Sequence, residues 1–230
     1  MRDEAIDLCG QVDFTRTDAM PLLERDAQFR FACAGCGDCC RQRRDLVLSG
    51  YDLYRIARRL SLPPRIVAAA FCKSYLAPES CLPALRLTPD PKTGNCRFFE
   101  GSACTVHAAR PLACALYPLG QSIDTVTAQT EYYVQTPLCG ARAGEARTLQ
   151  DYLQDSAVLD RAGVDARWAI VCTQLSHRLQ AAGGTDNPRF STAVRRMERA
   201  LYYDYELGDD FYPQFCQNIE ILMPLLDRML

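Results

Sequence analysis

The sequence predicts an α+β fold that is mainly helical, in which a cysteine-rich core with one short β-hairpin is followed by a helical C-terminal half. Three observations carry this prediction. Eight of the ten cysteines between positions 33 and 139 fall in turn-rich sequence, a run rich in Thr, Val and Tyr spans 123–136, and apolar residues recur at helical spacing beyond Gly144. We therefore expect an N-terminal extension at 1–28, a cysteine-cluster domain at 29–144 and a helical region at 145–230 packed on it.

The first cysteines are unusually close together. Thiolates are soft ligands that select zinc, copper(I) or iron–sulfur clusters, and they bind in the deprotonated form at neutral pH. Gly35 and Gly37 lie between the cysteines and allow the close backbone approach that lets neighbouring side chains converge. The spacing C-x2-C-x2-C-C therefore predicts a metal-binding segment, formed by Cys33, Cys36, Cys39 and Cys40.

A disulfide framework is the alternative explanation of these thiols. Such frameworks are typical of short secreted chains with an even number of cysteines, whereas this chain has 230 residues, 13 cysteines and a charged start, Met1-Arg2-Asp3-Glu4. No apolar run approaches the roughly 18 residues of a membrane span. We therefore expect a cytoplasmic protein without a membrane partner, in which reducing conditions keep the thiols available for metal.

The charge of the chain argues against nucleic acid as a partner. The formal net charge is −2 and the pI is about 5.8, so there is no global attraction to a polyanion. The arginines that follow the cysteine run fit a solvated helix face, or a group that offsets the negative charge of a metal cluster: Arg41, Arg43, Arg44, Arg55, Arg58, Arg59 and Arg65. Only two of the 26 basic residues are lysine, which is typical of a GC-rich bacterial genome.

Two helices are predicted after the first cysteine run. Ser49 with Asp52 three residues later indicates a helix start, and an apolar stripe continues to Leu60. The pair Pro63-Pro64 suits the first turn of a second helix, which we expect over 65–75.

The middle of the chain predicts short elements that present further thiols. Short strands or loops over 82–106 bring Cys96 and Cys104 to the surface of the core. A short helix over 107–115 then carries Cys114. Because thiols occupy so much of this half, we expect it to hold little apolar core and to need metal for folding.

The hairpin and the C-terminal helices complete the predicted fold. The hairpin over 123–136 has its second strand at 131–135 and leads to Cys139. Beyond it, a helical period predicts apolar stripes at 149–157, 168–179, 190–201 and 215–230. Cys172 falls in one of these stripes, where it reads as a small buried apolar residue.

The predicted ligands are enough for two four-cysteine centres, or for one centre with spare thiols. Neighbouring side chains point in divergent directions, so we expect Cys39 and Cys40 to serve different centres. In bacterial ferredoxins a C-x2-C-x2-C run gives three ligands to one [4Fe–4S] cluster, and a further cysteine serves the other. The predicted metal ligands are Cys33, Cys36, Cys39, Cys40, Cys96, Cys104, Cys114 and Cys139.

The spacing favours an iron–sulfur cluster, of the [4Fe–4S] type, over zinc. Three ligands within seven residues suit a cube-shaped cluster, whereas structural zinc sites commonly use two separated C-x2-C pairs. Zinc stays open as the alternative, because Cys104 and His107 form a Cys-x2-His pair; His107 equally fits a surface position at a helix start. We expect Arg110 to hydrogen-bond a metal-binding thiolate, a backbone carbonyl or a nearby carboxylate. The alternative is that Arg110 lies on the surface.

The cysteines belong to a longer pattern. It reads Phe31-Ala32-Cys33-x-x-Cys36-Gly37-x-Cys39-Cys40, then Cys96-x7-Cys104-x-x-His107-x-x-Arg110-Pro111-x-x-Cys114-x-x-Tyr117-Pro118, then Cys139-Gly140. Over about residues 29–140 this pattern resembles the YkgJ-like cysteine-cluster family, described as zinc- or iron-chelating proteins with a CxxCxxCC signature. Flagellin lysine N-methylases carry a related cluster, so the resemblance implies that the module can form part of an iron–sulfur methyl-transfer enzyme. This chain is shorter, and it has Ala115 where the family often shows Arg.

The sequence thus predicts a metal-binding protein, an iron–sulfur protein of electron transfer, sensing or metal handling. The alternative is an iron–sulfur enzyme related to protein lysine N-methylases. No C-x3-C-x2-C run, glycine-rich nucleotide loop or nucleophile–base pair supports an enzyme. Metal ions are the predicted partners; the acidic, tyrosine-rich segment 202–212 fits either a protein-docking surface or a solvated loop with half-buried rings.

Overall fold

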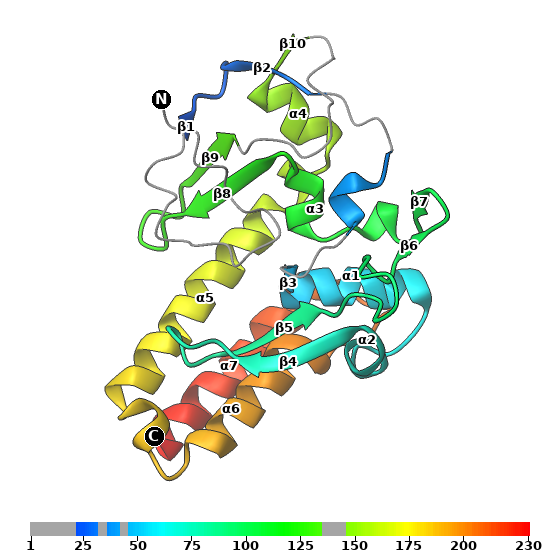
Figure 1. Cartoon of the computed structure of the whole chain (residues 1–230). Coiled ribbons are helices and arrows are strands. Elements are labelled where there is room, and N and C mark those ends of the chain that lie inside the picture. Colours follow the sequence, from blue (N-terminus) through cyan, green and yellow to red (C-terminus); the bar gives the residue numbers. More distant parts are fainter. Residues whose placement is uncertain (1–21, 32–35, 42–45, 135–145) are drawn as a thin grey trace. The chain divides into compact units, whose positions relative to one another are not determined.

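The computed structural model describes residues 22–31, 36–41, 46–134 and 146–230 (Figure 1). These ranges contain seven α-helices and ten short strands, and helices dominate the C-terminal half. The predicted α+β, mainly helical class is therefore confirmed. Among the described helices, none combines the length and the apolar character that a bilayer crossing requires.

The chain folds into two compact units, each assembled from segments that are distant in sequence. The thiol unit contains the described residues of 1–46 with 87–124 and 129–162, and the helical unit contains 47–86, 125–128 and 163–230. From the sequence we expected domain boundaries at residues 28 and 144. These boundaries stay a prediction.

The helical unit begins with the predicted capped helix. The Ser49 hydroxyl accepts a hydrogen bond from the backbone N–H of Asp52, and the Asp52 carboxylate accepts one from the backbone N–H of Ser49, both at 3.1 Å. This capping box satisfies two N–H groups that a helix start leaves without intrahelical partners. The elements of the unit are β3 (Val47–Leu48), α1 (Gly50–Leu60), α2 (Pro64–Phe71), β4 (Cys72–Leu76), β5 (Pro83–Leu87), α5 (Ala162–Ala181), α6 (Phe190–Glu198), a π-helical turn (Arg199–Tyr203) and α7 (Phe211–Met229).

The second predicted helix is shorter than expected. It ends at Phe71, and Cys72–Leu76 forms strand β4 instead of continuing the helix to residue 75. The strand lies at the edge of the sheet β3-β5-β4, and the guanidinium of Arg86 in β5 stacks over the Tyr75 ring at 4.8 Å. Pairing with β5 thus overrides the local helical pattern, because tertiary context outweighs propensity differences of a few tenths of a kcal/mol per residue.

Three of the four predicted C-terminal apolar stripes, at 168–179, 190–201 and 215–230, supply core residues of the helical unit, whereas the stripe at 149–157 lies in the core of the thiol unit. The acidic, tyrosine-rich segment 202–212 contains two buried rings, those of Tyr202 and Tyr205. The Tyr205 ring stacks on Phe211 with ring centroids 4.7 Å apart. Tyr212 is 44% exposed. Fully buried core residues of this unit include Leu53, Ile56, Val67, Leu85, Val171, Leu175, Leu179, Met197, Leu201 and Phe215.

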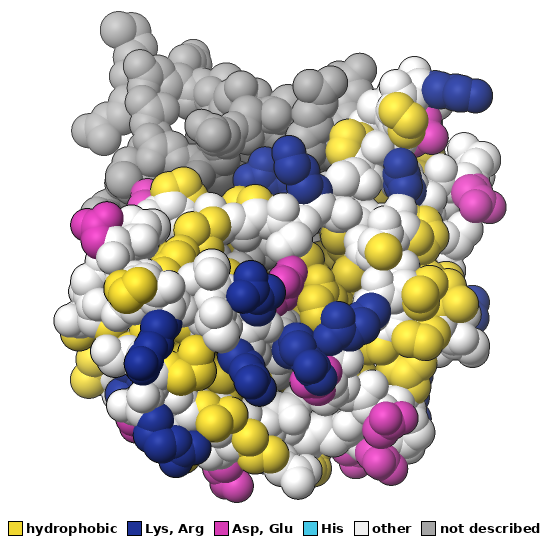
Figure 2. Space-filling view, turned by 90° about the horizontal axis from the view of Figure 1, so that it is seen from below, with side chains coloured by type: hydrophobic (Ala, Val, Ile, Leu, Met, Phe, Trp, Pro, Cys, Tyr) yellow, Lys and Arg dark blue, Asp and Glu magenta, His cyan; other side chains and the backbone are white. Residues whose placement is uncertain are grey.

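Three arginines of the predicted helix face, Arg58, Arg59 and Arg65, lie on the surface of the helical unit. Arg58 and Arg59 are exposed near the end of α1, and Arg65 stacks over the Tyr203 ring at 4.8 Å, with Nη2 3.8 Å from an Asp204 carboxylate oxygen. Figure 2 shows Lys and Arg side chains spread over one face of the molecule, with acidic and apolar side chains among them. This arrangement fits the solvated helix face that the sequence allowed.

The thiol unit is built from short elements. Its largest sheet has the order β1-β9-β8, and two-stranded sheets pair β2 with β10 and β6 with β7. The elements are β1 (Leu22–Leu23), β2 (Gln28–Arg30), a 3-10 turn (Asp38–Cys40), β6 (Phe99–Glu100), β7 (Ala103–Cys104), a 3-10 turn (His107–Ala109), α3 (Leu112–Leu116), β8 (Leu119–Ile123), β9 (Thr130–Val134), β10 (Ala146–Thr148), α4 (Leu149–Asp155) and a 3-10 turn (Leu159–Arg161).

The predicted hairpin is present but begins earlier. Its first strand starts at Leu119 rather than at Ile123, and its second strand is Thr130–Val134. Gly120 pairs with Tyr133, and a Cβ on Gly120 would stand 2.1 Å from the Tyr133 ring. Gly120 is therefore a strand residue whose lack of a side chain leaves room for a tyrosine ring.

The predicted helix over 107–115 is divided into two. A 3-10 turn at His107–Ala109 is followed by α3, which starts at Leu112 after Arg110 and Pro111. The backbone of both intervening residues is extended, since residues before a proline avoid the helical region. The break sets the direction from which α3 presents Cys114.

The thiol unit has its own apolar core, contrary to our expectation. Phe31, which follows β2, packs together with aromatic and aliphatic residues of α3, β8 and α4 and of the residues that follow α3 and α4. The segment 149–158 supplies the part of this cluster that the cysteine pattern does not include. The unit therefore holds structure that does not depend on thiols. The cluster consists of Phe31, Ala115, Leu116, Tyr117, Leu119, Leu149, Tyr152, Leu153 and Val158.

Candidate metal centre

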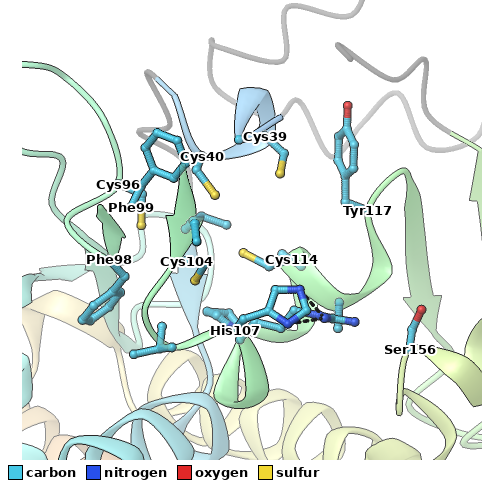
Figure 3. Close-up of a pocket in the computed structure, with 18 of the residues that line it drawn as sticks. Cys39, Cys40, Cys96, Phe98, Phe99, Cys104, His107, Cys114, Tyr117 and Ser156 are labelled. Atoms are coloured by element: carbon cyan, nitrogen blue, oxygen red, sulfur yellow. Dashed lines mark hydrogen bonds between the residues drawn. The ribbon is translucent and has the colours of Figure 1, made fainter. Parts of the chain in front are cut away.

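The thiol unit contains a cavity of about 710 Å³. Figure 3 shows the sulfur atoms of its cysteines converging on one part of this space, from three separate segments of the chain. Five of the predicted ligands line it: Cys39, Cys40, Cys96, Cys104 and Cys114.

A 3-10 turn places the adjacent pair Cys39 and Cys40. The backbone N–H of Cys40 donates to the carbonyl of Gly37 at 2.8 Å, which closes the turn. Gly37 has φ +74°, in the left-handed region that favours glycine. The carbonyl of Cys40 in turn accepts from the N–H of Cys96 at 2.8 Å, so the backbone itself joins two of the thiol segments.

The other thiols come from the segment 96–114. Cys104 lies on β7 opposite Phe99 of β6. Cys114 sits in the first turn of α3, where its N–H donates to the Pro111 carbonyl at 2.9 Å. A hairpin and a helix start therefore hold these two thiols from different directions.

Gly37→Ala is expected to destabilise the thiol segment more than the same change at Gly94. Both glycines have nearly the same φ, +74° and +73°, so the backbone strain of about 1–2 kcal/mol is common to both variants. The two positions differ in the space around the new Cβ. At Gly37 it would stand 2.3 Å from both Cε2 and Cζ of Phe99, whereas at Gly94 nothing lies within 4 Å of it. The Phe99 ring also carries the guanidinium of Arg41 at 5.5 Å, so moving it disturbs a second contact.

Denaturant unfolding of the two variants measures this difference. We expect Gly37→Ala to lose about 1–3 kcal/mol more of the free energy of unfolding than Gly94→Ala. Equal losses for the two variants would show that the Phe99 contact does not constrain the turn.

Crowding among the thiols and burial disfavour their charged forms. The pKa of Cys40 lies well above its ordinary value, because of a hydrogen bond with the Cys39 side chain, burial, and the charges of Cys39, Cys114 and Cys96. Burial and then Cys39 raise the pKa of Cys104, while the Val106 backbone and the Arg110 charge lower it. A bound cation would reverse this balance, because thiolates coordinate metal in the deprotonated form.

Metal affinity is therefore expected to rise with pH across the neutral range. Raised pKa values mean that Cys40 and Cys104 carry protons at neutral pH without metal, so binding must release these protons and acid must compete with it. Competition with a chelator of known proton affinity, at pH 6.5, 7.5 and 8.5, measures the effect. An affinity that stays constant over this range would contradict thiolate coordination.

The adjacent pair does not diverge as the sequence suggested. Cys39 and Cys40 line the same cavity, and the Cys39 side chain hydrogen-bonds the Cys40 thiol. The turn that brings both thiols to one side is local backbone geometry, which the spacing alone does not specify. Which cysteines share a centre, and whether there are one or two centres, stays a prediction.

The remaining predicted ligands are not assembled in the described structure. Cys36 is exposed and does not line the cavity, and Cys33 and Cys139 lie outside the described residues. Within the described ranges, no three or more His, Cys, Asp or Glu residues are already arranged to hold an ion. These ranges contain six of the eight predicted ligands.

Arg110 and His107 form a contact that the sequence did not suggest. Nη1 of Arg110 lies 2.8 Å from Nε2 and 3.2 Å from Nδ1 of His107 (Figure 3). Burial, followed by the Arg110 charge, lowers the pKa of His107, so the imidazole is neutral at neutral pH and accepts from the guanidinium. Both residues line the cavity, and the spacing of three residues is the sequence signal that could have indicated the pair.

Sequence reasoning also missed the apolar walls of the cavity. Phe31, Phe98 and Tyr117 are buried residues that line it, and Tyr152 and Arg147 reach it from the segment after residue 145. Phe31 and Tyr117 fall within the cysteine pattern, but the pattern does not indicate that they line a cavity, and Tyr152 and Arg147 lie outside it.

The segment that holds the thiols is recognised by a family model. Residues 32–140 match the CxxCxxCC model, which is described as a "putative zinc- or iron-chelating domain". Comparison with the curated proteins and with the solved structures found no match. The match supports metal binding by this segment, which the clustered thiols also favour. Over residues 32–140 the chain is therefore similar to the CxxCxxCC family.

Proposed function

We propose that the thiol cavity binds an iron–sulfur cluster, of the [4Fe–4S] type, and that the protein acts in electron transfer, sensing or metal handling. The observation that supports this most is the convergence of five cysteine side chains on one cavity. The proposed ligands are the eight predicted cysteines, from Cys33 to Cys139.

The number of thiols supports a cluster over one zinc ion. A structural zinc ion takes four ligands, and five thiols already line the cavity before Cys33, Cys36 and Cys139 are counted. Two iron–sulfur clusters, or a binuclear zinc site with shared thiolates, can bind more cysteine thiolates than the four that one zinc ion takes. We favour iron–sulfur and keep zinc as the alternative.

The polar surroundings fit a negatively charged group. Arg110 places its charge where it lowers the pKa of Cys104, and Arg41 lies beside Cys40 in sequence. The guanidinium of Arg41 is shared, because it also pairs with Asp38 at 2.8 Å. A bound cluster would supply one-electron redox chemistry, while the thiols hold it and Arg110 and the cavity walls set its electrostatic environment.

Arg110→Ala is expected to weaken metal retention about 10-fold or more, because groups that orient and stabilise metal ligands contribute that much. Arg97→Ala is the matched control, since Arg97 is an exposed arginine of the same unit that does not line the cavity. Metal loss to a chelator, followed over time, measures the difference. Equal retention in the two variants would remove Arg110 from the metal centre.

Reversible reduction tests the proposed electron-transfer role. Anaerobically prepared protein should lose its broad visible absorption on addition of dithionite and recover it on reoxidation, with a paramagnetic signal in one of the two states. A colourless protein whose bound metal does not respond to dithionite would favour zinc.

The enzyme alternative, a relation to lysine N-methylases, stays a prediction, and no feature of the described structure favours it.

A further inference from the structure

The cavity is much larger than its proposed metal requires. Its volume of about 710 Å³ falls within the roughly 300–1,000 Å³ that small-molecule sites occupy. Eight cluster atoms, each given the roughly 30 Å³ of a liquid water, would occupy on the order of 240 Å³. A metal centre at the thiols therefore leaves room for an organic molecule beside it.

The space that remains has a rigid aromatic wall. The Phe31 ring packs edge-on against Tyr117 and Tyr152, with ring centroids 5.8 Å and 6.3 Å apart. The Tyr152 hydroxyl donates to the Tyr117 carbonyl, which fixes the wall on one side. Figure 3 shows Tyr117 and Ser156 on one side and Phe98 and Phe99 on the other, with the thiols between them. Such a wall suits a flat apolar body.

A guanidinium with unused donors lies on the same wall. Arg147, on β10, stacks over the Tyr152 ring at 5.9 Å and donates from Nη2 to Asp155 at 2.8 Å. Among the described residues its Nε and Nη1 donate to no protein acceptor. A guanidinium presents five N–H groups in a fork that matches a carboxylate, so Arg147 can accept a second carboxylate beside Asp155.

We infer that the cavity binds a small organic monocarboxylate with a flat apolar body, whose carboxylate pairs with Arg147 and whose body lies against Phe31, Tyr117 and Tyr152, facing the thiols. A single negative charge fits this position better than a phosphate dianion, because Asp155 and the thiolates are already negative. The inference deepens the proposed function and rests on it, since the metal centre defines the end of the cavity that the ligand faces.

Titration of the full-length, metal-loaded protein with 2-naphthoate, followed by calorimetry, tests the inference. We expect saturable binding of one naphthoate per chain, and at least about 10-fold weaker binding of the neutral 2-naphthamide, because a hydrogen-bonded charge pair is lost. Arg147→Gln should weaken naphthoate binding by about the same factor. Arg178→Gln should leave it unchanged, because Arg178 lies in the helical unit and makes a comparable pair with Asp227, at 3.6 Å.

A second variant keeps the test decisive if Arg147→Gln does not fold. Ser156→Trp places a large side chain in the cavity wall and should abolish naphthoate binding without lowering metal content. Metal is measured in every sample, so the two ideas can fail separately. Metal-loaded protein that does not bind naphthoate, or that binds naphthamide equally well, overturns this inference alone. Wild-type protein that retains no metal overturns the proposed function.

Discussion

Cys40→Ser is expected to lower metal retention by about 100-fold or more, a larger loss than that of a group that only supports a ligand. The Cys40 thiol lies close enough to Cys39, Cys96 and Cys114 for their charges to raise its pKa, and it lines the cavity with them. A serine hydroxyl keeps its proton at neutral pH and is a hard ligand, so it does not replace a thiolate for zinc or iron–sulfur.

Cys216→Ser is the matched control for this substitution. Cys216 is a half-buried cysteine of α7, in the helical unit, and it does not line the cavity. Metal bound per chain after dialysis against chelator distinguishes the two variants. If Cys40→Ser keeps as much metal as Cys216→Ser, the convergence of thiols in the cavity is not a metal centre.

Removal of metal is expected to open the thiol segments while the two apolar cores stay folded. Residues 36–41 and 96–114 are short elements held by turns and by few buried side chains, so the metal contributes much of their stability. The helices α5 and α7 bury a continuous core, and the cluster around Phe31 and Leu149 does the same for the thiol unit.

Hydrogen exchange with and without chelator measures this directly. Amides of 36–41 and 96–114 should lose protection by an order of magnitude or more, because their local opening free energy falls. Amides in the middle of α5 and α7 should exchange at the same rate in both samples. Unchanged protection in the thiol segments would mean that metal is not part of their fold, and a loss everywhere would mean that the cores depend on it as well.

Local signals predicted the fold where local interactions decide it. The capping box at Ser49 and the helical period of the C-terminal half gave helices in the right places. The helix predicted over 65–75 was wrong in its second half. Residues 72–76 instead form β4, which pairs with β5 at 83–87, and a helical pattern does not reveal this pairing. The early start of β8 has a similar cause, since its register with β9 requires Gly120 opposite Tyr133.

The spacing of the cysteines predicted the site better than the fold. Five of the six predicted ligands that the structure describes line one cavity, although Cys36 does not, and their role as ligands stays a prediction. The direction of neighbouring thiols was predicted wrongly, because it depends on the 3-10 turn after Gly37. Tyr152 and Arg147 could not be predicted, because they reach the cavity from a segment more than 30 residues beyond Cys114. Phe31 and Tyr117 lie within three residues of a predicted ligand, but the spacing of the cysteines does not say that their rings pack together.

Metal and sulfide analysis of anaerobically purified protein tests the central claim most directly. If the thiol cavity holds a [4Fe–4S] cluster, the protein is brown and contains iron and acid-labile sulfide in equal amounts, about four of each per cluster. The same preparation of Cys40→Ser should lose both together. Stoichiometric zinc without sulfide would contradict the iron–sulfur assignment, and a preparation with neither iron nor zinc would contradict a metal centre in this cavity.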